Sequence, residues 1–109
     1  MPKDTHILDA LYDLVESRKS ADPDESYTAR LYQKGTGKIC QKVGEEASEV
    51  IVDALQLKYG QADKSGLAEE SADLLYHLLV LWADQGLAPE DVWDVLDARF
   101  LKKTKGETE

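Results

Sequence analysis

The chain has 109 residues, of which 42% are hydrophobic and 32% are charged, a composition that predicts one soluble globular domain rather than a disordered chain. Its formal net charge of −9 argues against non-specific binding of DNA or RNA, because such binding needs a basic surface. The longest apolar run, from Leu74 to Ala83, is too short to span a membrane and is interrupted by His77.

The N-terminus and the cysteine content predict a cytoplasmic location. The first residues, from Met1 to His6, become polar and acidic where a secretory signal would need a long apolar segment. Cys40 is the only cysteine, so no intrachain disulfide can form. We expect Cys40 itself to be a small, buried helix residue.

Apolar residues at helical spacing predict a first helix from about Thr5 to Lys19, with Asp4 or Thr5 as its N-cap. The polar segment 20–25 is a loop by composition. A short helix is then expected from Thr28 to Lys34, capped by Ser26 or Thr28. It should end at the segment 35–37, where two glycines release the backbone.

Two long helices and a final shorter one complete the predicted fold. They run from about Lys38 to Tyr59, from Ser65 or Gly66 to Gln85, and from Pro89 to about Lys103. Residues 105–109 are expected to fray after a single domain over residues 1–104. The fold class is therefore all-α, a bundle of antiparallel helices. The small size and the apolar faces at 47–55 and 74–82 favour completion of this bundle in a homodimer or a larger homo-oligomer.

Carboxylates border the apolar stripe of the first long helix. With Val43 at 0°, Ala47, Val50 and Ala54 fall within about 40° of it and form the expected core stripe. Glu46 then lies at about 300° and Glu49 at about 240°, next to this stripe.

The following helix repeats the arrangement. Glu70, Asp73 and His77 share an arc of about 60°. This arc lies at the edge of a broad face, centred about 200° from Glu69, that is expected to be core. The residues of that face are Leu74, Leu75, Leu78, Leu81 and Trp82.

If the two acidic stripes face each other, four or five carboxylates converge. Like charges gathered out of water repel, and a hard cation such as Mg²⁺ or Mn²⁺ removes that repulsion. The alternative is that these acids form a solvated helix face.

A basic segment precedes the acidic helix. Arg30, Lys34, Lys38 and Lys42 are spaced four residues apart, with no acidic residue between them. They are predicted to bind the phosphate groups of a substrate, and a solvated basic face is the alternative.

The acidic motifs resemble those of a known superfamily. Residues 42–49, Lys-Val-Gly-Glu-Glu-Ala-Ser-Glu, followed by Glu70-Ser71-Ala72-Asp73, resemble the E-E-x-x-E … E-x-x-D signature of the all-α, MazG-type nucleoside triphosphate pyrophosphohydrolases. Together with the segments 26–31 and 72–81, they most resemble the phosphoribosyl-ATP pyrophosphatase family. Because the chain starts at Met1 and has one cysteine, it is expected to be the form that is not fused to a cyclohydrolase.

The resemblance implies an enzyme that hydrolyses phosphoribosyl-ATP to phosphoribosyl-AMP and pyrophosphate, the second step of histidine biosynthesis. It implies a Mg²⁺ site formed by Glu46, Glu49, Glu70 and Asp73. The motif leaves open whether Glu45 or Glu46 binds the metal, and we prefer Glu46 because it lies nearer the core stripe. The number of metal ions also stays open.

The mechanism expected from this resemblance needs a base and groups that hold the substrate. Glu45 or Glu49 would accept the proton of the attacking water. Thr28 is expected to donate its hydroxyl to the substrate. His77, which on an apolar helix is otherwise an internally bonded core residue, is placed on the substrate side.

Two other functions are weighed against this one. The first is hydrolysis of non-standard or deoxynucleoside triphosphates by an enzyme with the same metal site, which the segment 26–31 and Tyr76-His77 argue against. The second is a non-catalytic helical dimerisation module, in which the acids are only surface.

Overall fold

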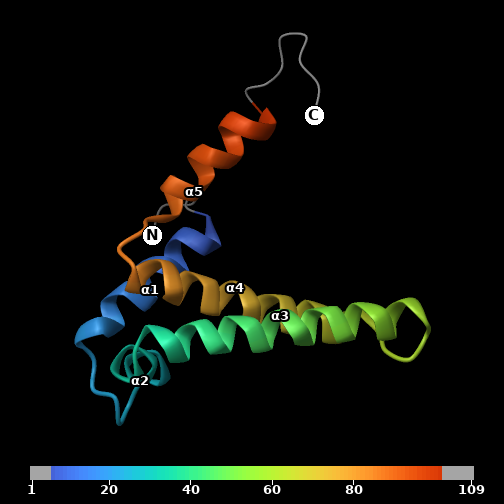
Figure 1. Ribbon diagram of the computed structural model, residues 1–109, viewed down its shortest axis with the longest axis horizontal. Helices are drawn as coiled ribbons and strands as arrows, with labels where there is room; N and C mark the ends of the chain where they lie inside the picture. The colour runs from blue at the N-terminus through green and yellow to red at the C-terminus, as the bar shows by residue number, and fades with distance from the viewer. Residues whose placement is uncertain (1–5, 102–109) are drawn as a thin grey trace.

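The computed structural model describes residues 6–101, which are helical apart from short connections (Figure 1). No strand occurs in this part of the chain, and the predicted all-α class is confirmed. The elements are α1 (Ile7–Ser17), a 3₁₀ turn (Arg18–Ser20), α2 (Tyr27–Lys34), α3 (Thr36–Lys58), α4 (Lys64–Asp84), α5 (Pro89–Leu96) and a π-helical turn (Asp97–Leu101).

The long helices α3 and α4 form an antiparallel hairpin, as predicted (Figure 1). Helix α1 packs on α4, and α2 packs on the beginning of α3. The far end of the hairpin extends beyond the other helices and is covered by none of them (Figure 1). The other described helices therefore pack against only one end of the hairpin.

The helix starts differ in part from those predicted. His6 caps α1, because its Nδ1 accepts the Leu8 N–H at 3.1 Å, so the predicted cap at Asp4 or Thr5 is wrong. Ser26 caps α2 by accepting the Ala29 N–H, which confirms one of the two predicted N-caps.

A single glycine separates α2 from α3, where two were predicted to break the helix. Gly35 has φ = +100°, a conformation that favours glycine, whereas Gly37 is already helical. The start of α3 is held by Thr36, whose hydroxyl donates to Asp84 Oδ2 at 2.6 Å. Cys40, expected to be buried, is exposed on α3.

The buried core joins the first four helices. It comprises Val15 of α1, Leu31 of α2, Ile39 of α3, and Leu79, Val80 and Ala83 of α4. The buried side of α4 is therefore displaced from the predicted face, although Leu81 and Trp82 of that face still pack against the core. Leu74, Leu78, Leu81 and Trp82 are only partly buried, and Leu75 is 42% exposed.

On α3, Val43, Ala47 and Val50 of the predicted core stripe are partly buried, and only Ala54 is exposed. Four large apolar residues of α3 also contact solvent: Ile51, Val52, Leu55 and Tyr59, with exposed fractions between 47% and 69%. We call these residues and Leu75 the uncovered apolar residues of the hairpin. Helical periodicity identified apolar faces but did not tell which of them the chain covers itself.

Helix α5 is attached through aromatic contacts. Trp93 meets Trp82 of α4 edge to face, with ring centroids 6.0 Å apart, and its Nε1–H donates to Asp9 of α1 at 3.2 Å. The predicted end of this helix at Lys103 and the predicted fraying tail lie outside the described residues. No helix of the described range is both long and apolar enough to cross a membrane.

Ile39→Ala should destabilise the protein by about 2–5 kcal/mol, because Ile39 is fully buried where α1, α2, α3 and α4 meet. Ile7→Ala removes the same atoms from a residue that is 74% exposed, and it should change the free energy of unfolding far less. Denaturant unfolding at one fixed protein concentration measures both. Equal effects of the two substitutions would contradict the position of the core.

Candidate metal and phosphate site

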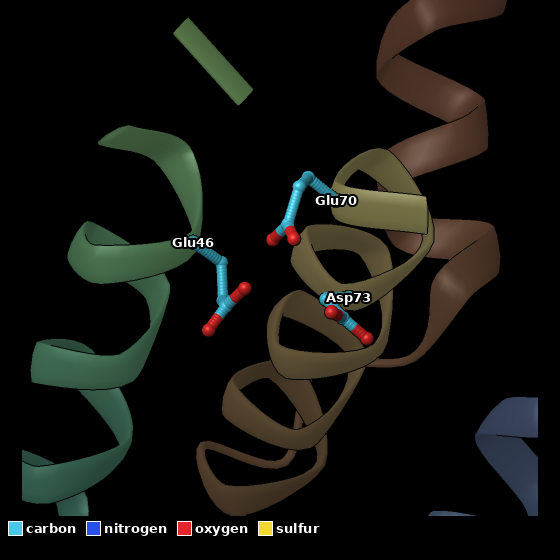
Figure 2. A group of neighbouring side chains, drawn as sticks. All are labelled: Glu46, Glu70 and Asp73. Carbon is cyan, nitrogen blue, oxygen red and sulfur yellow. The ribbon is translucent and has the colours of Figure 1, made fainter. Parts of the chain in front are cut away.

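Three carboxylates from the two long helices converge. Glu46 of α3 and Glu70 and Asp73 of α4 each offer an oxygen, and these oxygens lie within 4.8 Å of one another. Figure 2 shows the side chains of Glu46 and Glu70 extending toward each other between the helices. We call Glu46, Glu70 and Asp73 the carboxylate cluster.

The local sequence explains why these three meet. Glu70 and Asp73 are three residues apart and so lie one helical turn from each other on one side of α4. Glu46 lies in the middle of α3, and the antiparallel pairing of α3 with α4 places it opposite that turn (Figure 2). Three carboxylates of the two acidic stripes therefore converge, fewer than the four or five expected if the stripes face each other.

The environment of Glu70 opposes its ionisation. Removal from water raises the pKa of its carboxyl group, and the negative charges of Asp73, Glu46, Glu49 and Asp53 raise the pKa further. Glu46 is also largely withdrawn from solvent, with 14% of its side chain exposed. The cluster thus brings negative charges together on two partly buried residues, Glu46 and Glu70, and on the exposed Asp73.

Such a donor set fits a hard divalent cation. Carboxylate oxygens are the ligands that Mg²⁺ and Mn²⁺ prefer, and a cation among them replaces mutual repulsion by attraction. The spacing of the three oxygens lets one ion contact all of them after small side-chain movements. The chemistry of the cluster therefore suits the cation that the sequence predicted.

The two further predicted acids lie at the edge of the cluster. Glu49 is exposed and does not belong to the converging group, but it lies close enough to Glu70 to raise the pKa of that residue. Glu45 is bound by Gln41 Nε2 at 2.7 Å and by Lys42 Nζ at 3.2 Å. The hydrogen bond from Gln41, and after it that from Lys42, lowers the pKa of the Glu45 carboxyl group. Between Glu45 and Glu46, the geometry favours Glu46 as the ligand.

Lys42 is the basic residue that the fold brings to the cluster. Its Nζ lies 3.2 Å from Glu45 and 3.9 Å from Glu46, and 24% of its side chain is exposed. The hydrogen bond with Glu45 raises the pKa of the Lys42 ammonium group, against a smaller opposite effect of burial. Lys42 therefore stays charged beside the carboxylates.

The other predicted phosphate ligands lie at varying distance from this arrangement. Lys38 helps to lower the pKa of Glu45, so it lies within electrostatic reach of the same edge. Arg30 is engaged elsewhere, since it donates to the Pro23 carbonyl at 2.8 Å and lies over the Tyr27 ring. Lys34 is exposed in the last turn of α2. Thr28 is buried, and its hydroxyl is hydrogen-bonded to the Tyr76 hydroxyl.

His77 is buried and uses both ring nitrogens within the protein. Nδ1 lies 2.8 Å from the Asp73 carbonyl oxygen, and Nε2 lies 3.2 Å from the Tyr27 hydroxyl. It is therefore an internally bonded residue, which was the alternative considered from sequence. Its aromatic partners Tyr27 and Tyr76 were not predicted as part of the site, although both lie in the segments that carried the resemblance.

An antiparallel helical hairpin with converging carboxylates defines an all-α protein whose carboxylate cluster lies between two long helices. The family model described as phosphoribosyl-ATP pyrophosphohydrolase matches residues 8–100, and the chain belongs to this family.

Similar proteins carry the corresponding names. The phosphoribosyl-ATP pyrophosphatase of Azospirillum brasilense is 56% identical over 93 residues, which cover 85% of this chain and 79% of the relative. That of Paramagnetospirillum magneticum is 54% identical over 99 residues, or 91% of this chain and 86% of the relative. The histidine biosynthesis bifunctional protein HisIE of Vibrio vulnificus is 54% identical over 92 residues, which are 84% of this chain but 41% of that protein.

Glu70→Gln should make the stability of the metal-free protein depend less on pH. Because the pKa of Glu70 is raised in the folded state, the folded protein holds this proton more tightly than the unfolded chain does. Its contribution to stability is therefore lost as pH rises from the ordinary glutamate pKa of 4.5 through the raised value. Thermal unfolding with a chelator should show this loss for wild type and a smaller one for Glu70→Gln.

Glu69→Gln is the matched control, since Glu69 is an exposed neighbour outside the cluster. Mg²⁺ should raise the unfolding temperature of wild type and of Glu69→Gln. The rise should be much smaller for Glu70→Gln. A normal response of Glu70→Gln to Mg²⁺ would exclude Glu70 from the cation site.

Proposed function

We propose that this chain hydrolyses phosphoribosyl-ATP to phosphoribosyl-AMP and pyrophosphate, the second step of histidine biosynthesis, with Mg²⁺ as cofactor and Mn²⁺ as a possible substitute. The observation that carries the proposal is the convergence of Glu46, Glu70 and Asp73 in a chain of this family. A triphosphate carries several negative charges, so a site built of carboxylates accepts it only when a cation lies between the two.

Different residues are proposed to bind the cation and to bind the phosphates. Glu46, Glu70 and Asp73 hold the cation, with Glu49 as a further ligand on the exposed side. The bound cation supplies charge neutralisation on the phosphate oxygens and makes the attacking water more acidic. Positioning and neutralisation then account for most of the acceleration, as is general in phosphoryl transfer.

A carboxylate must accept the proton of the attacking water. Glu45 and Glu49 remain the two proposed bases, and the structure supports Glu49 more strongly. Glu45 is occupied by hydrogen bonds from Gln41 and Lys42, which lower its pKa and so weaken it as a base. Glu49 lies near Glu70 with its side chain open to solvent, where a water molecule can reach it.

Phosphate groups are proposed to bind on the Lys42 side of the carboxylate cluster. Lys42 Nζ makes a hydrogen bond only with Glu45 among its two carboxylate neighbours, since 3.9 Å to Glu46 is too long for one. An ammonium group has three N–H donors, so donors remain for a phosphate oxygen. Lys38, one turn earlier on α3, is proposed to extend this basic side, whereas Arg30, Lys34, Thr28 and His77 receive less support as direct ligands.

We further propose that the protein acts as a homodimer in the cytoplasm. The uncovered apolar residues of the hairpin are the support for the dimer, because Ile51, Val52 and Leu55 share one side of a helix by their spacing and an exposed apolar face marks an interaction site. A second hairpin packed on this surface would complete a bundle of four long helices. The exposed thiol of Cys40 fits a reducing compartment.

The substrate proposal is tested by pyrophosphate release. Phosphoribosyl-ATP should be hydrolysed with a kcat/KM at least about a hundredfold above that for ATP, dATP and non-standard triphosphates, a difference that requires about 2.7 kcal/mol of selective binding. Asp73→Asn should abolish the reaction while the far-UV circular dichroism spectrum stays unchanged. A preference for deoxy or non-standard triphosphates would contradict the proposal in favour of a house-cleaning activity.

The dimer proposal is tested by light scattering at micromolar concentration. Wild type should show twice the mass of one chain, and Leu55→Glu should shift the equilibrium toward the monomer by placing a charge on the uncovered surface. Leu14→Glu is the matched control, since Leu14 is 46% exposed on α1 and is not one of the uncovered apolar residues of the hairpin. A monomeric wild-type protein would contradict this proposal.

A further inference from the structure

A row of side chains leads away from the carboxylate cluster along α4. Glu70, Asp73 and His77 are three and four residues apart, so they follow one another on one side of that helix. His77 is buried, and its Nδ1 lies 2.8 Å from the Asp73 carbonyl oxygen. The side of α4 that carries two members of the cluster therefore continues into His77.

Helix α2 extends this row with an aromatic ring and a guanidinium group. The Tyr27 hydroxyl lies 3.2 Å from Nε2 of His77, and the Arg30 guanidinium lies over the Tyr27 ring, 5.8 Å from its centroid. Tyr27 and Arg30 are three residues apart and so lie on one side of α2. The row thus runs from the cluster through His77 and Tyr27 to Arg30, each residue in contact with the next.

The last two members of the row meet solvent and are held in place. Tyr27 is 43% exposed, and Arg30 is exposed as well. Nη1 of Arg30 donates to the Pro23 carbonyl at 2.8 Å, but a guanidinium group has five N–H donors. Donors of Arg30 therefore remain for an anion, and little side-chain freedom is lost when one binds, because Pro23 and Tyr27 already fix the group.

The proposed substrate presents its groups in a matching order. Phosphoribosyl-ATP carries its triphosphate on one ribose and a further phosphate on a second ribosyl group, and the purine base lies between the two. ATP has the triphosphate and the base but lacks the second phosphate. A cationic group beyond the aromatic ring is therefore suited to distinguish one nucleotide from the other.

We propose that Arg30 binds the phosphate of the phosphoribosyl group and so determines selectivity for phosphoribosyl-ATP over ATP, while the Tyr27 ring holds Arg30 and contacts the base. The inference rests on the proposed function, because it takes the triphosphate to lie at the carboxylate cluster. A planar guanidinium group binds a phosphate through two parallel hydrogen bonds, which an ammonium group does not reproduce. His77 serves this arrangement without touching the ligand, since it anchors the Tyr27 hydroxyl.

Calorimetric binding of phosphoribosyl-AMP and of AMP, both with Mg²⁺, tests the proposal without turnover. The two ligands differ only in the phosphoribosyl group. Wild type should bind phosphoribosyl-AMP about ten- to hundredfold more tightly than AMP, as expected of hydrogen bonds to a charged group. Arg30→Gln should reduce this ratio below about threefold, and Arg30→Lys should restore only part of it.

Arg99→Gln is the matched control, since Arg99 is exposed in the π-helical turn after α5 and the substitution removes the same charge. It should leave the ratio at the wild-type value. Tyr27→Leu, which removes the ring under Arg30, should lower the ratio more than Tyr27→Phe, which keeps the ring. In steady-state kinetics, Arg30→Gln should lower kcat/KM for phosphoribosyl-ATP relative to that for ATP by about the same factor as in binding.

An unchanged ratio in Arg30→Gln would overturn the inference, as would an equal loss in Arg99→Gln. Failure of wild type to bind phosphoribosyl-AMP more tightly than AMP would overturn it as well. A wild-type protein that prefers phosphoribosyl-AMP through Arg30 but does not hydrolyse phosphoribosyl-ATP would contradict the proposed function instead. In that case the calorimetric ratios would still support the role of Arg30.

Discussion

The repulsion among Glu46, Glu70 and Asp73 is the constraint around which this molecule is arranged. Their oxygens lie within 4.8 Å of one another only because α3 and α4 are held side by side. That pairing depends on Ile39, Leu79 and Val80, which are buried at the end of the hairpin where α1 and α2 also pack. Apolar packing thus supplies the free energy that keeps unfavourable charges together, and a cation is the natural complement of the result.

Side chains around the carboxylate cluster come from α2 as well as from the hairpin. Helix α2 brings Tyr27 against His77, and α3 carries Lys42 within ion-pair distance of Glu46. These residues belong to three different helices, and no single helical face contains them. The arrangement places the basic Lys42 beside an acidic cluster, in a chain whose net charge is −9.

Sequence periodicity predicted the all-α fold and the two acidic stripes that hold Glu46, Glu70 and Asp73, because residues three or four apart share one side of a helix. The meeting of the stripes was an expectation that depended on how the two helices pack. Periodicity failed for the core of α4, where the predicted face with Leu74 and Leu75 is half open and the side with Leu79 and Val80 is buried. Helix α4 is apolar around most of its circumference, so periodicity alone cannot tell which face its own chain covers. The internal bonds of Thr28 and His77 depend on Tyr76 and Tyr27, and such contacts between distant helices leave no trace in local spacing.

A single residue between α2 and α3 sets the angle at which the two helices meet, and we call this connection the corner. Gly35, with φ = +100°, is the whole connection, so the relative direction of the two axes is set by one pair of backbone dihedral angles. Adding or deleting a residue at this corner would rotate one helix relative to the other by about 100° and displace every side chain that the corner relates. Over the course of evolution the segment from Ser26 to Glu46 should accordingly change its residues more freely than its length.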